Sequence, residues 1–361
     1  MRVMSDTTIP ETPAEIDAAW LNAALVDWPE IESVTHDDIG DGTGIFGQIS
    51  RLNLTYAGDA GSSPAKMIVK MACLEPENLA VGNALGIYER ELRFYEELAD
   101  QLPFRIPAKY LASRADDGRF VLIIEDLSGE FVVGDQVVGA TLAQAEAVVD
   151  ALIPFHAQWW EHADLGSMEW LPVPNAPAYK AAVPGIYRAG LPVLEAEWTD
   201  RVSAEAIAVA KAVEPKFEEL MDRMAEGPRT VIHSDTRLDN IFFSADGNNE
   251  VAIIDFQLAL RGRAVADIAY LVGTSVPTDI GKANWEALLR RWHNGIVAAG
   301  IDYAWDDAVK AYKEIAMFYM SGAMSLIGTF DAGEGRGAQL VEAYSTRIVE
   351  HAAYIEAAQV L

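Results

Sequence analysis

The segment HSDTRLDN, residues 233–240, places a histidine, two aspartates, an arginine and an asparagine close together. It lies between Thr230–Ile232 and Ile241–Phe243, two apolar runs with the length and composition of short strands. Polar groups held between buried strands need either hydrogen-bond partners or a chemical role. An aspartate in such a turn can accept a proton from a hydroxyl, and an asparagine can offer a carbonyl oxygen to a metal ion.

His233, Asp235 and Asn240 have the H-x-D-x-x-x-x-N spacing of kinase catalytic loops. There the aspartate positions and deprotonates the attacking hydroxyl, and the asparagine binds Mg²⁺. In VAIIDFQ, Asp255 follows another apolar run, and a carboxylate there suits the metal that bridges the β- and γ-phosphates. An isolated aspartate at a strand end is usually a turn or cap residue, so the whole set carries the prediction.

A glycine-rich hairpin and a strand lysine are expected to bind the nucleotide. Gly42, Gly44 and Gly47 match G-x-G-x-x-G, but residues 52–56 alternate as a strand does, whereas a Rossmann loop leads into a helix. A strand–glycine loop–strand unit covers the phosphates in kinases; the alternative is a hairpin without a ligand. Lys70, in the strand MIVKMA, either reaches solvent at a sheet edge or points into a cleft and binds the α- and β-phosphates.

The elements around these residues form a β-rich part followed by a mainly helical part. We therefore expect an N-terminal lobe over residues 1–126 and a C-terminal lobe over 127–361, with turn residues at the junction. Alternation and turn signals predict strands at 31–56 (two), 67–72, 108–112, 119–125 and within 229–255. Helical periodicity and capping signals predict helices over 12–25, 76–102, 141–162, 196–225, 283–299, 306–328 and 337–358.

The composition excludes several classes of partner. With 27 Lys and Arg against 55 Asp and Glu, the formal charge is −28, which argues against nucleic acid and indicates a solvated acidic surface or a cationic substrate. A single cysteine excludes an internal disulfide. The N-terminus lacks a signal-peptide core, and the chargeless stretch 315–330 is short for a membrane span, so we expect a buried helix there and a cytoplasmic protein without membrane insertion.

With these residues in place, the chain resembles the kinase-like small-molecule phosphotransferases, a group with aminoglycoside phosphotransferases, choline kinases and ecdysteroid-kinase-like proteins. The resemblance covers about residues 13–350 and is carried by HSDTRLDN, IDFQLALRGRAVADIAYL, YERELRFYEEL, VLIIEDLSG and FHAQWW. It implies a protein-kinase-like α+β fold with a small β-rich N-lobe and a larger, mainly helical C-lobe. It also implies ATP and Mg²⁺ as cofactors.

The resemblance implies further nucleotide contacts. ELRFY matches the E-x-x-F-Y pattern of the family, which makes Glu91 the expected partner of Lys70. The EDL that follows the fifth strand marks the hinge, so the backbone from Ile124 to Leu127, including Glu125, is expected to contact adenine. The same helix as Glu91 also carries Glu89, Glu96 and Glu97.

The chain departs from the family pattern at two positions. Ser234 replaces the glycine that usually follows the loop histidine, a small change that should be tolerated, and Gln257 replaces the glycine of D-F-G, as in ecdysteroid-kinase-like relatives. Arg237 lies where protein-serine kinases carry a lysine. It either stabilises charge on the transferring phosphoryl group, which would make it catalytic, or orients the loop through Asp239 or a backbone carbonyl.

Three further polar residues are expected to be structural. His233 should hold the segment of the metal-binding aspartate by hydrogen bonds. His156, in FHAQWW, is interpreted as a packed helical histidine. Asp267, in ADIAYL, should anchor the loop or cap a helix.

The leading hypothesis is therefore a transfer of the γ-phosphoryl group of ATP to a hydroxyl of a small molecule. A protein kinase is disfavoured because only about ten residues separate Asp255 from the helix-like VADIAYL, and no A-P-E follows. A nucleotide-binding module of the same fold without catalysis is the alternative. The acceptor stays open between an apolar or aromatic alcohol, which C-terminal aromatic residues would suit, and a polycationic aminoglycoside-like compound, which the acidity would suit.

Overall fold

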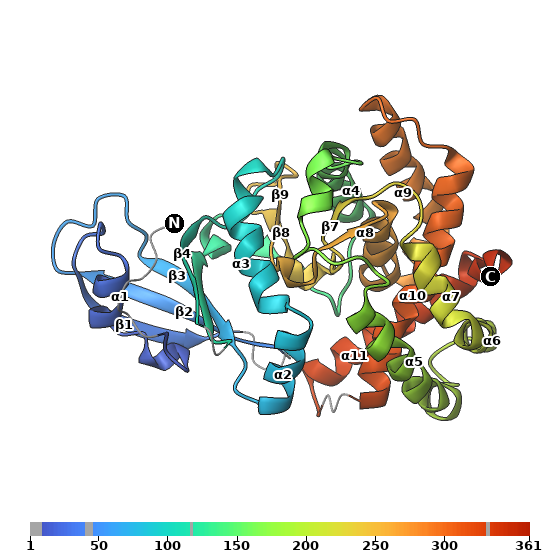
Figure 1. Cartoon of the computed structure of the whole chain (residues 1–361), viewed down its shortest axis with the longest axis horizontal. Coiled ribbons are helices and arrows are strands. Elements are labelled where there is room, and N and C mark those ends of the chain that lie inside the picture. Colours follow the sequence, from blue (N-terminus) through green and yellow to red (C-terminus); the bar gives the residue numbers. More distant parts are fainter. Residues whose placement is uncertain (1–8, 40–45, 116–117, 330–332) are drawn as a thin grey trace. The chain divides into compact units, whose positions relative to one another are not determined.

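The computed structural model of the protein describes residues 9–39, 46–115, 118–329 and 333–361, and these residues form two compact units (Figure 1). The first unit contains the chain up to Gln101 together with Ile106–Glu130. The second contains Leu102–Arg105 together with Phe131–Leu361. The first is built on a sheet and the second is mainly helical, as the sequence predicts.

The first unit contains a five-stranded sheet in the order β1-β2-β3-β5-β4, and all of its neighbours are antiparallel. The middle of the sheet is apolar: Val121 and Ile123 of β5, and Met67 and Val69 of β3, are fully buried. In β2, buried residues alternate with more exposed ones, as the sequence pattern predicted, whereas β5 is buried at five successive residues. Their bounds are β1 Ile31–Asp38, β2 Gly47–Tyr56, β3 Lys66–Ala72, β4 Lys109–Arg114 and β5 Phe120–Glu125.

The helix predicted over 12–25 begins later than predicted. Thr12 precedes only a 3-10 turn, Pro13–Glu15, and its side chain does not cap that turn. The α-helix α1, Ala18–Ala24, begins after Asp17, whose carboxylate accepts the N–H of Trp20 at 2.8 Å. The helical conformation is interrupted between the two. Ile16 lies there, and its side chain is fully buried in the core of the sheet, a position that a continuous helix would not give it.

The helix predicted over 76–102 is also interrupted. It divides into α2 Pro76–Ala84, α3 Ile87–Glu97 and a 3-10 turn at Ala99–Gln101. Gly86 lies between α2 and α3 with a φ of 66°, a left-handed conformation that glycine adopts without steric cost. The guanidinium of the buried Arg90 donates to the Leu85 carbonyl at 2.7 Å and stabilises the break.

The helices of the second unit pack around short strands (Figure 1). Strand β7 pairs with β10, and a three-stranded sheet has the order β6-β8-β9. The strands are β6 Phe131–Val133, β7 Thr230–Ile232, β8 Ile241–Ser244, β9 Val251–Ile253 and β10 Leu260–Gly262. The helices are α4 Leu142–Gln158, α5 Pro177–Glu197, α6 Ala204–Val213, α7 Phe217–Met224, α8 Val265–Tyr270, α9 Thr278–Ala298, α10 Trp305–Thr329 and α11 Arg336–Tyr354.

Short helical turns connect these elements. The chain forms 3-10 turns at Leu127–Gly129 in the first unit and Ala163–Ser167, Glu214–Lys216, Leu238–Asn240, Phe256–Leu258 and Ala357–Val360 in the second. A π-helical turn at Leu271–Ser275 directly follows α8. Such turns are rare and frequently occur at functional sites.

Helix α5 is absent from the sequence-based prediction, and the helix predicted over 196–225 is interrupted. The chain ends α5 at Glu197, and the predicted helix divides into α6 and α7, which the 3-10 turn Glu214–Lys216 separates. Pro184 and Pro192 lie inside α5, and prolines argue against a helix in a sequence-based prediction. A packed helix can nevertheless tolerate them. Its packing partner is α10, and a Cβ added to Gly190 would lie 2.2 Å from the Met324 carbonyl, so glycine permits the close crossing.

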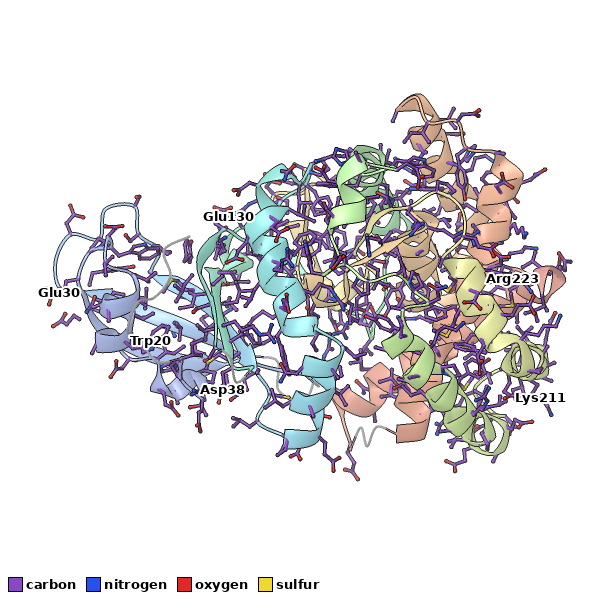
Figure 2. The ribbon with its side chains drawn as sticks, viewed as in Figure 1. Trp20, Glu30, Asp38, Glu130, Lys211 and Arg223 are labelled. Carbon is purple, nitrogen blue, oxygen red and sulfur yellow. The ribbon has the colours of Figure 1, made fainter. Side chains whose placement is uncertain are left out.

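The chargeless stretch near the C-terminus forms most of α10. Its Ile315, Met317, Met320 and Met324 side chains are fully buried, which confirms the prediction of a buried helix over its described part. Across the residues that the structure describes, no helix combines the length and apolar character that crossing a membrane requires. Other charged side chains are exposed: Figure 2 shows Glu30, Asp38 and Lys211 pointing outward.

Candidate active site

The loop HSDTRLDN connects two anchored strands of the second unit. It begins after β7, which pairs with β10, and leads through the 3-10 turn Leu238–Asn240 into β8, which pairs with β6 and β9. Because both ends of the loop are fixed by ladders, its polar side chains keep defined positions. Asp235 and Asn240 are 6% and 3% exposed.

The side chain of Asn240 forms hydrogen bonds directly with Asp235. The amide nitrogen Nδ2 of Asn240 donates to the backbone carbonyl of Asp235 and to its Oδ2, both at 2.9 Å. Both partners can only accept, so the amide nitrogen must face Asp235. The carbonyl oxygen Oδ1 of Asn240 is therefore directed elsewhere, and it is the atom that could bind a metal ion.

Asp255 follows strand β9 and lies near this pair. The N–H of Ile254 donates to the Asn240 carbonyl at 3.0 Å, which brings Asp255 and Asn240 close together. Asp255 has a φ of 68°, a left-handed conformation that costs a residue with a side chain on the order of 1–3 kcal/mol and is typical of functional sites. Its Oδ2 accepts a long bond of 3.4 Å from Gln257, the residue that replaces the usual glycine.

The donor set of Asn240 and Asp255 fits Mg²⁺. Both residues offer oxygen, which Mg²⁺ prefers, and Mg²⁺ is usually bound by one or two protein groups together with phosphates and waters. Among the described residues, no group of three or more His, Cys, Asp and Glu side chains could hold a metal ion. Asn240 and Asp255 are thus two oxygen donors that could hold Mg²⁺.

His233 connects the loop to the segment of Asp255. One ring nitrogen, Nε2, lies 2.8 Å from the Ile254 carbonyl and donates to it, while Nδ1 accepts the N–H of Asp235 at 3.2 Å. The ring packs edge-on against Phe256 at 4.7 Å between centroids. These contacts confirm the structural role predicted for His233.

Asp267 anchors the loop from α8, which confirms one of the two roles predicted for it. Its fully buried carboxylate accepts the N–H of Ser234 at 2.7 Å and the N–H of His233 at 2.9 Å. His156 supplies a third bond, because its Nδ1 accepts from Trp292 at 3.0 Å and its Nε2–H therefore donates to Asp267 at 3.0 Å. His156 is thus the packed helical histidine that the sequence predicts.

Arg237 faces two carboxylates of its own loop. Its Nε lies 3.5 Å from Oδ2 of Asp235, and one terminal nitrogen lies 3.6 Å from Oδ2 of Asp239. Burial by itself lowers the pKa of the guanidinium, but the charges of Asp235, Asp239 and Asp255 outweigh it and raise that pKa above its ordinary value. The contacts correspond to the loop-orienting role among the two that the sequence left open.

Sequence reasoning missed two residues that contact the loop. The hydroxyl of Tyr270 donates to Oδ1 of Asp235 at 2.7 Å. A signal for it was present, because Tyr270 follows Asp267 by three residues in a helix, and residues at that spacing share a face. Gln136 had no such signal: its fully buried amide accepts the N–H of Leu238 at 2.8 Å and donates to the Thr274 carbonyl at 2.6 Å.

In the first unit, Lys70 and Glu91 form a buried ion pair. Lys70, on β3, is 11% exposed in its side chain, and its Nζ lies 2.5 Å from Oε1 of Glu91 on α3, which is 2% exposed. Burial distinguishes Glu91 from the exposed Glu89, which instead pairs with Arg114 at 2.9 Å. A lysine held in this way points away from solvent and toward α3.

The remaining predicted nucleotide contacts belong to the ends of strands in the first unit. Gly47 opens β2 opposite Ala72, and Gly42 and Gly44 lie outside the described residues. The N–H of Glu125 donates to the Ala108 carbonyl at 2.9 Å, and its carboxylate accepts from the Ala108 N–H at 2.9 Å. Glu125 is thus engaged within the sheet, while Leu127 is a buried residue of the next 3-10 turn.

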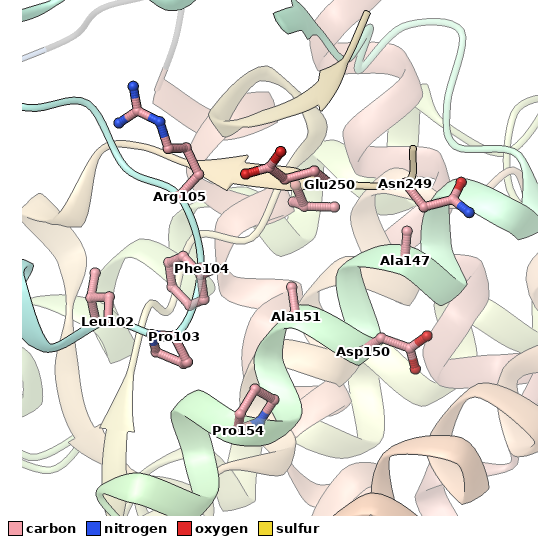
Figure 3. A pocket seen from close by; sticks show the side chains of 11 residues that line it. Leu102, Pro103, Phe104, Arg105, Ala147, Asp150, Ala151, Pro154, Asn249 and Glu250 are labelled. Atoms are coloured by element: carbon pink, nitrogen blue, oxygen red, sulfur yellow. The ribbon is translucent and has the colours of Figure 1, made fainter. Parts of the chain in front are cut away.

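An open groove of about 600 Å³ elsewhere in the second unit contains none of the predicted site residues (Figure 3). It lies between the segment Leu102–Arg105, one face of α4 and the connection from β8 to β9. Figure 3 shows Phe104, Ala151 and Pro154 along its apolar part. The polar constellation around Asp235 is a separate feature.

Comparisons with known proteins identify a family and a fold for this chain. The sequence model of the ecdysteroid kinase-like family matches residues 41–299. No curated protein matches the sequence.

Among solved structures, the chain is similar in fold to a choline kinase from Streptococcus pneumoniae, with 15% identity, a TM-score of 0.51, and 88% of this chain and 94% of that chain covered. A spectinomycin phosphotransferase, solved with ADP and spectinomycin, has 11% identity and a TM-score of 0.51, with coverages of 94% and 97%. An aminoglycoside 2′-phosphotransferase, solved with GDP, has 14% identity and a TM-score of 0.51, with coverages of 85% and 91%.

Proposed function

The chain belongs to the ecdysteroid kinase-like family, and we propose that it is an ATP- and Mg²⁺-dependent phosphotransferase that acts on a hydroxyl of a small molecule. The observation that carries this proposal is the direct bond from Asn240 to Asp235. This hydrogen bond links two groups. The Asp235 carboxylate can accept a proton, and the amide oxygen of Asn240 can bind a metal ion. Phosphoryl transfer needs these two functions side by side.

Each residue has a distinct task. Asp235 orients the acceptor hydroxyl and takes its proton, while Asn240 and Asp255 would hold Mg²⁺. When bound, Mg²⁺ would neutralise charge on the β- and γ-phosphates. Lys70, kept in place by Glu91, would bind the α- and β-phosphates.

Three further groups complete the proposal. Arg237 holds Asp235 and Asp239 and would offer its positive charge to the transferring phosphoryl group once that group is bound. The hairpin with Gly42, Gly44 and Gly47 would cover the phosphates. The backbone from Glu125 to Leu127 would contact adenine, with the donor coming from a residue other than Glu125, whose N–H already bonds to Ala108.

A small molecule is a better acceptor than a peptide. Between Asp255 and α8 the chain has room only for the 3-10 turn Phe256–Leu258 and strand β10, which is paired with β7. No long segment is left there to receive a peptide, as protein kinases require.

The test is ADP release from Mg-ATP against pooled acceptors: sterols, phenols, sugars, choline-like amines and aminoglycosides. Asp235→Asn protein serves as the blank and should lose on the order of 10²–10⁴-fold in transfer rate while it still binds nucleotide. Transfer that survives this substitution would remove Asp235 from its role. Binding of Mg-ATP without transfer to any pool would instead support a nucleotide-binding module.

A further inference from the structure

A chain of tyrosine hydroxyls ends on the carboxylate proposed as the base. Tyr270 donates to Oδ1 of Asp235 at 2.7 Å, and Tyr344 donates to the Tyr270 hydroxyl at 3.1 Å. The direction of both bonds is fixed, because an ionised carboxylate can only accept. Each phenol is at least nine-tenths buried, so water does not compete for these bonds.

Packing against two helices holds the Tyr270 ring in place. Tyr270 is the last residue of α8, and it is followed by the π-helical turn Leu271–Ser275. Its ring packs edge-on against Tyr319 of α10 at 4.7 Å between centroids and lies 6.2 Å from Tyr344 of α11. The Thr274 hydroxyl donates to the Tyr270 carbonyl at 2.8 Å and secures the turn.

The two oxygens of Asp235 are held by different donors. Asn240 donates to Oδ2, and Tyr270 donates to Oδ1. A carboxylate with a donor on one oxygen can still rotate about its last bond, whereas donors on both oxygens fix its plane. Each oxygen has two lone-pair sites, so this arrangement leaves one on Oδ1 for an acceptor hydroxyl.

Tyr270 also keeps its proton. Burial raises the pKa of its phenol well above the ordinary value, and the neighbouring charge of Asp235 adds to this effect. Tyr270 is therefore a permanent donor, and it does not compete with Asp235 for the role of base.

We propose that Tyr270 is a positioning residue for phosphoryl transfer, and that Tyr344 acts through it. Tyr270 fixes the plane of the Asp235 carboxylate so that Oδ1 meets the acceptor hydroxyl in line with the γ-phosphoryl group. This inference rests on the proposed function. It goes beyond the catalytic loop, because both tyrosines come from helices of the C-terminal half.

The kinetic test uses substitutions that remove single hydroxyls and keep the rings. Tyr270→Phe should lower kcat about 10- to 100-fold, the range expected for a hydrogen bond to a charged group, with the KM for ATP unchanged within about two-fold. Tyr344→Phe should lower kcat by only about two- to five-fold, because Asp235 keeps its donor. The double variant should be no slower than Tyr270→Phe, since Tyr344 acts through Tyr270.

Tyr187→Phe is the matched control. Tyr187 is a fully buried tyrosine of the same unit, and its hydroxyl donates to the Ala210 carbonyl at 3.0 Å, away from the loop. It should lose similar stability and keep wild-type kcat. An equal loss of kcat in Tyr187→Phe, or additive losses in the double variant, would show a general structural effect and overturn the proposal.

A second measurement does not depend on turnover. In protein with ¹³Cζ-labelled tyrosine, the protected Tyr270 hydroxyl proton should give a downfield NMR signal that is absent from Tyr270→Phe and moves upfield in Asp235→Asn. If Asp235→Asn leaves this signal unmoved, the contact and the inference both fail. If the signal responds but wild-type protein transfers phosphate to no acceptor, the proposed function fails and positioning for transfer fails with it. If transfer occurs and Tyr270→Phe matches wild type, only the positioning inference fails.

Discussion

The N–H of Ser234 donates to Oδ1 of Asp267 at 2.7 Å, and Ser234 makes this bond with a φ of 66°. The left-handed backbone turns two successive N–H groups, those of His233 and Ser234, toward one carboxylate. This conformation explains why glycine is usual at this position in the family. Serine can adopt this conformation here because the Asp267 carboxylate holds the turn through two hydrogen bonds.

We predict that Ser234→Gly is more stable than Ser234→Ala by about 1 kcal/mol. Both variants lose the hydroxyl contact with Tyr319 at 3.3 Å, so the difference isolates the backbone. A left-handed conformation costs an L-residue about 1–2 kcal/mol, and the greater freedom of glycine in the unfolded chain offsets part of that gain. Urea unfolding of the two variants measures the difference, and an alanine variant of equal stability would contradict the strain.

Asp267→Asn should lower the free energy of unfolding by about 2–4 kcal/mol. Three donors converge on the carboxylate, from Ser234, His233 and His156, and an amide nitrogen would face at least one of them. Asp164→Asn is the control, since its side chain is 67% exposed, and the change there should stay within about 0.5 kcal/mol. Equal effects of the two substitutions would show that Asp267 does not anchor the loop.

Glu91→Gln should weaken nucleotide binding about ten-fold or more, because it leaves the Lys70 charge buried without its carboxylate. Glu89→Gln tests the same chemical change on the same helix at a side chain that is 47% exposed and should have little effect. Isothermal titration with Mg-ATP gives both affinities. If Glu89→Gln weakens binding as much as Glu91→Gln, the buried pair is not what holds Lys70.

The acid stability of the protein should depend on His351. Burial lowers the pKa of this imidazole to about 3, so the ring is neutral in the folded protein, where its Nε2 and the Tyr312 hydroxyl share a hydrogen bond of 2.8 Å. In the unfolded chain its pKa is about 6.5. Unfolding therefore takes up a proton between about pH 6.5 and pH 3, and stability is lost as the pH falls through that range.

The corresponding variant is His351→Gln, whose amide can still form a hydrogen bond with Tyr312 but does not titrate. Between about pH 7 and pH 5, it should lose about 2 kcal/mol less of its free energy of unfolding than the wild type does. Chemical denaturation at the two pH values measures this. The same loss in both proteins would assign the acid sensitivity to other groups.

Local patterns carried much of the fold and of the candidate site. Alternation predicted β2, in which Leu52 and Leu54 are buried and Thr55 is exposed, and the family resemblance identified Glu91 as the partner of Lys70. By contrast, a capping-box pattern at Thr12 led to a wrong helix start before Ile16, and helical periodicity gave no sign of the break at Gly86. At Ile16, burial of the side chain in the core determines the path of the chain. At Gly86, the left-handed backbone conformation ends the helix, and the Arg90 side chain stabilises the break.

By itself, the sequence determined the pairing of Asp235 with Asn240. The two residues are five apart in one loop between strands, so chain geometry alone keeps them within hydrogen-bond reach. Only the tertiary structure decided what fixes that pair. Tyr270 and Gln136 are far from the loop along the chain, and helix packing brings them to it, as it builds the proline-containing α5 against α10. Such contacts depend on which surfaces meet after folding, and no local spacing in the chain records that.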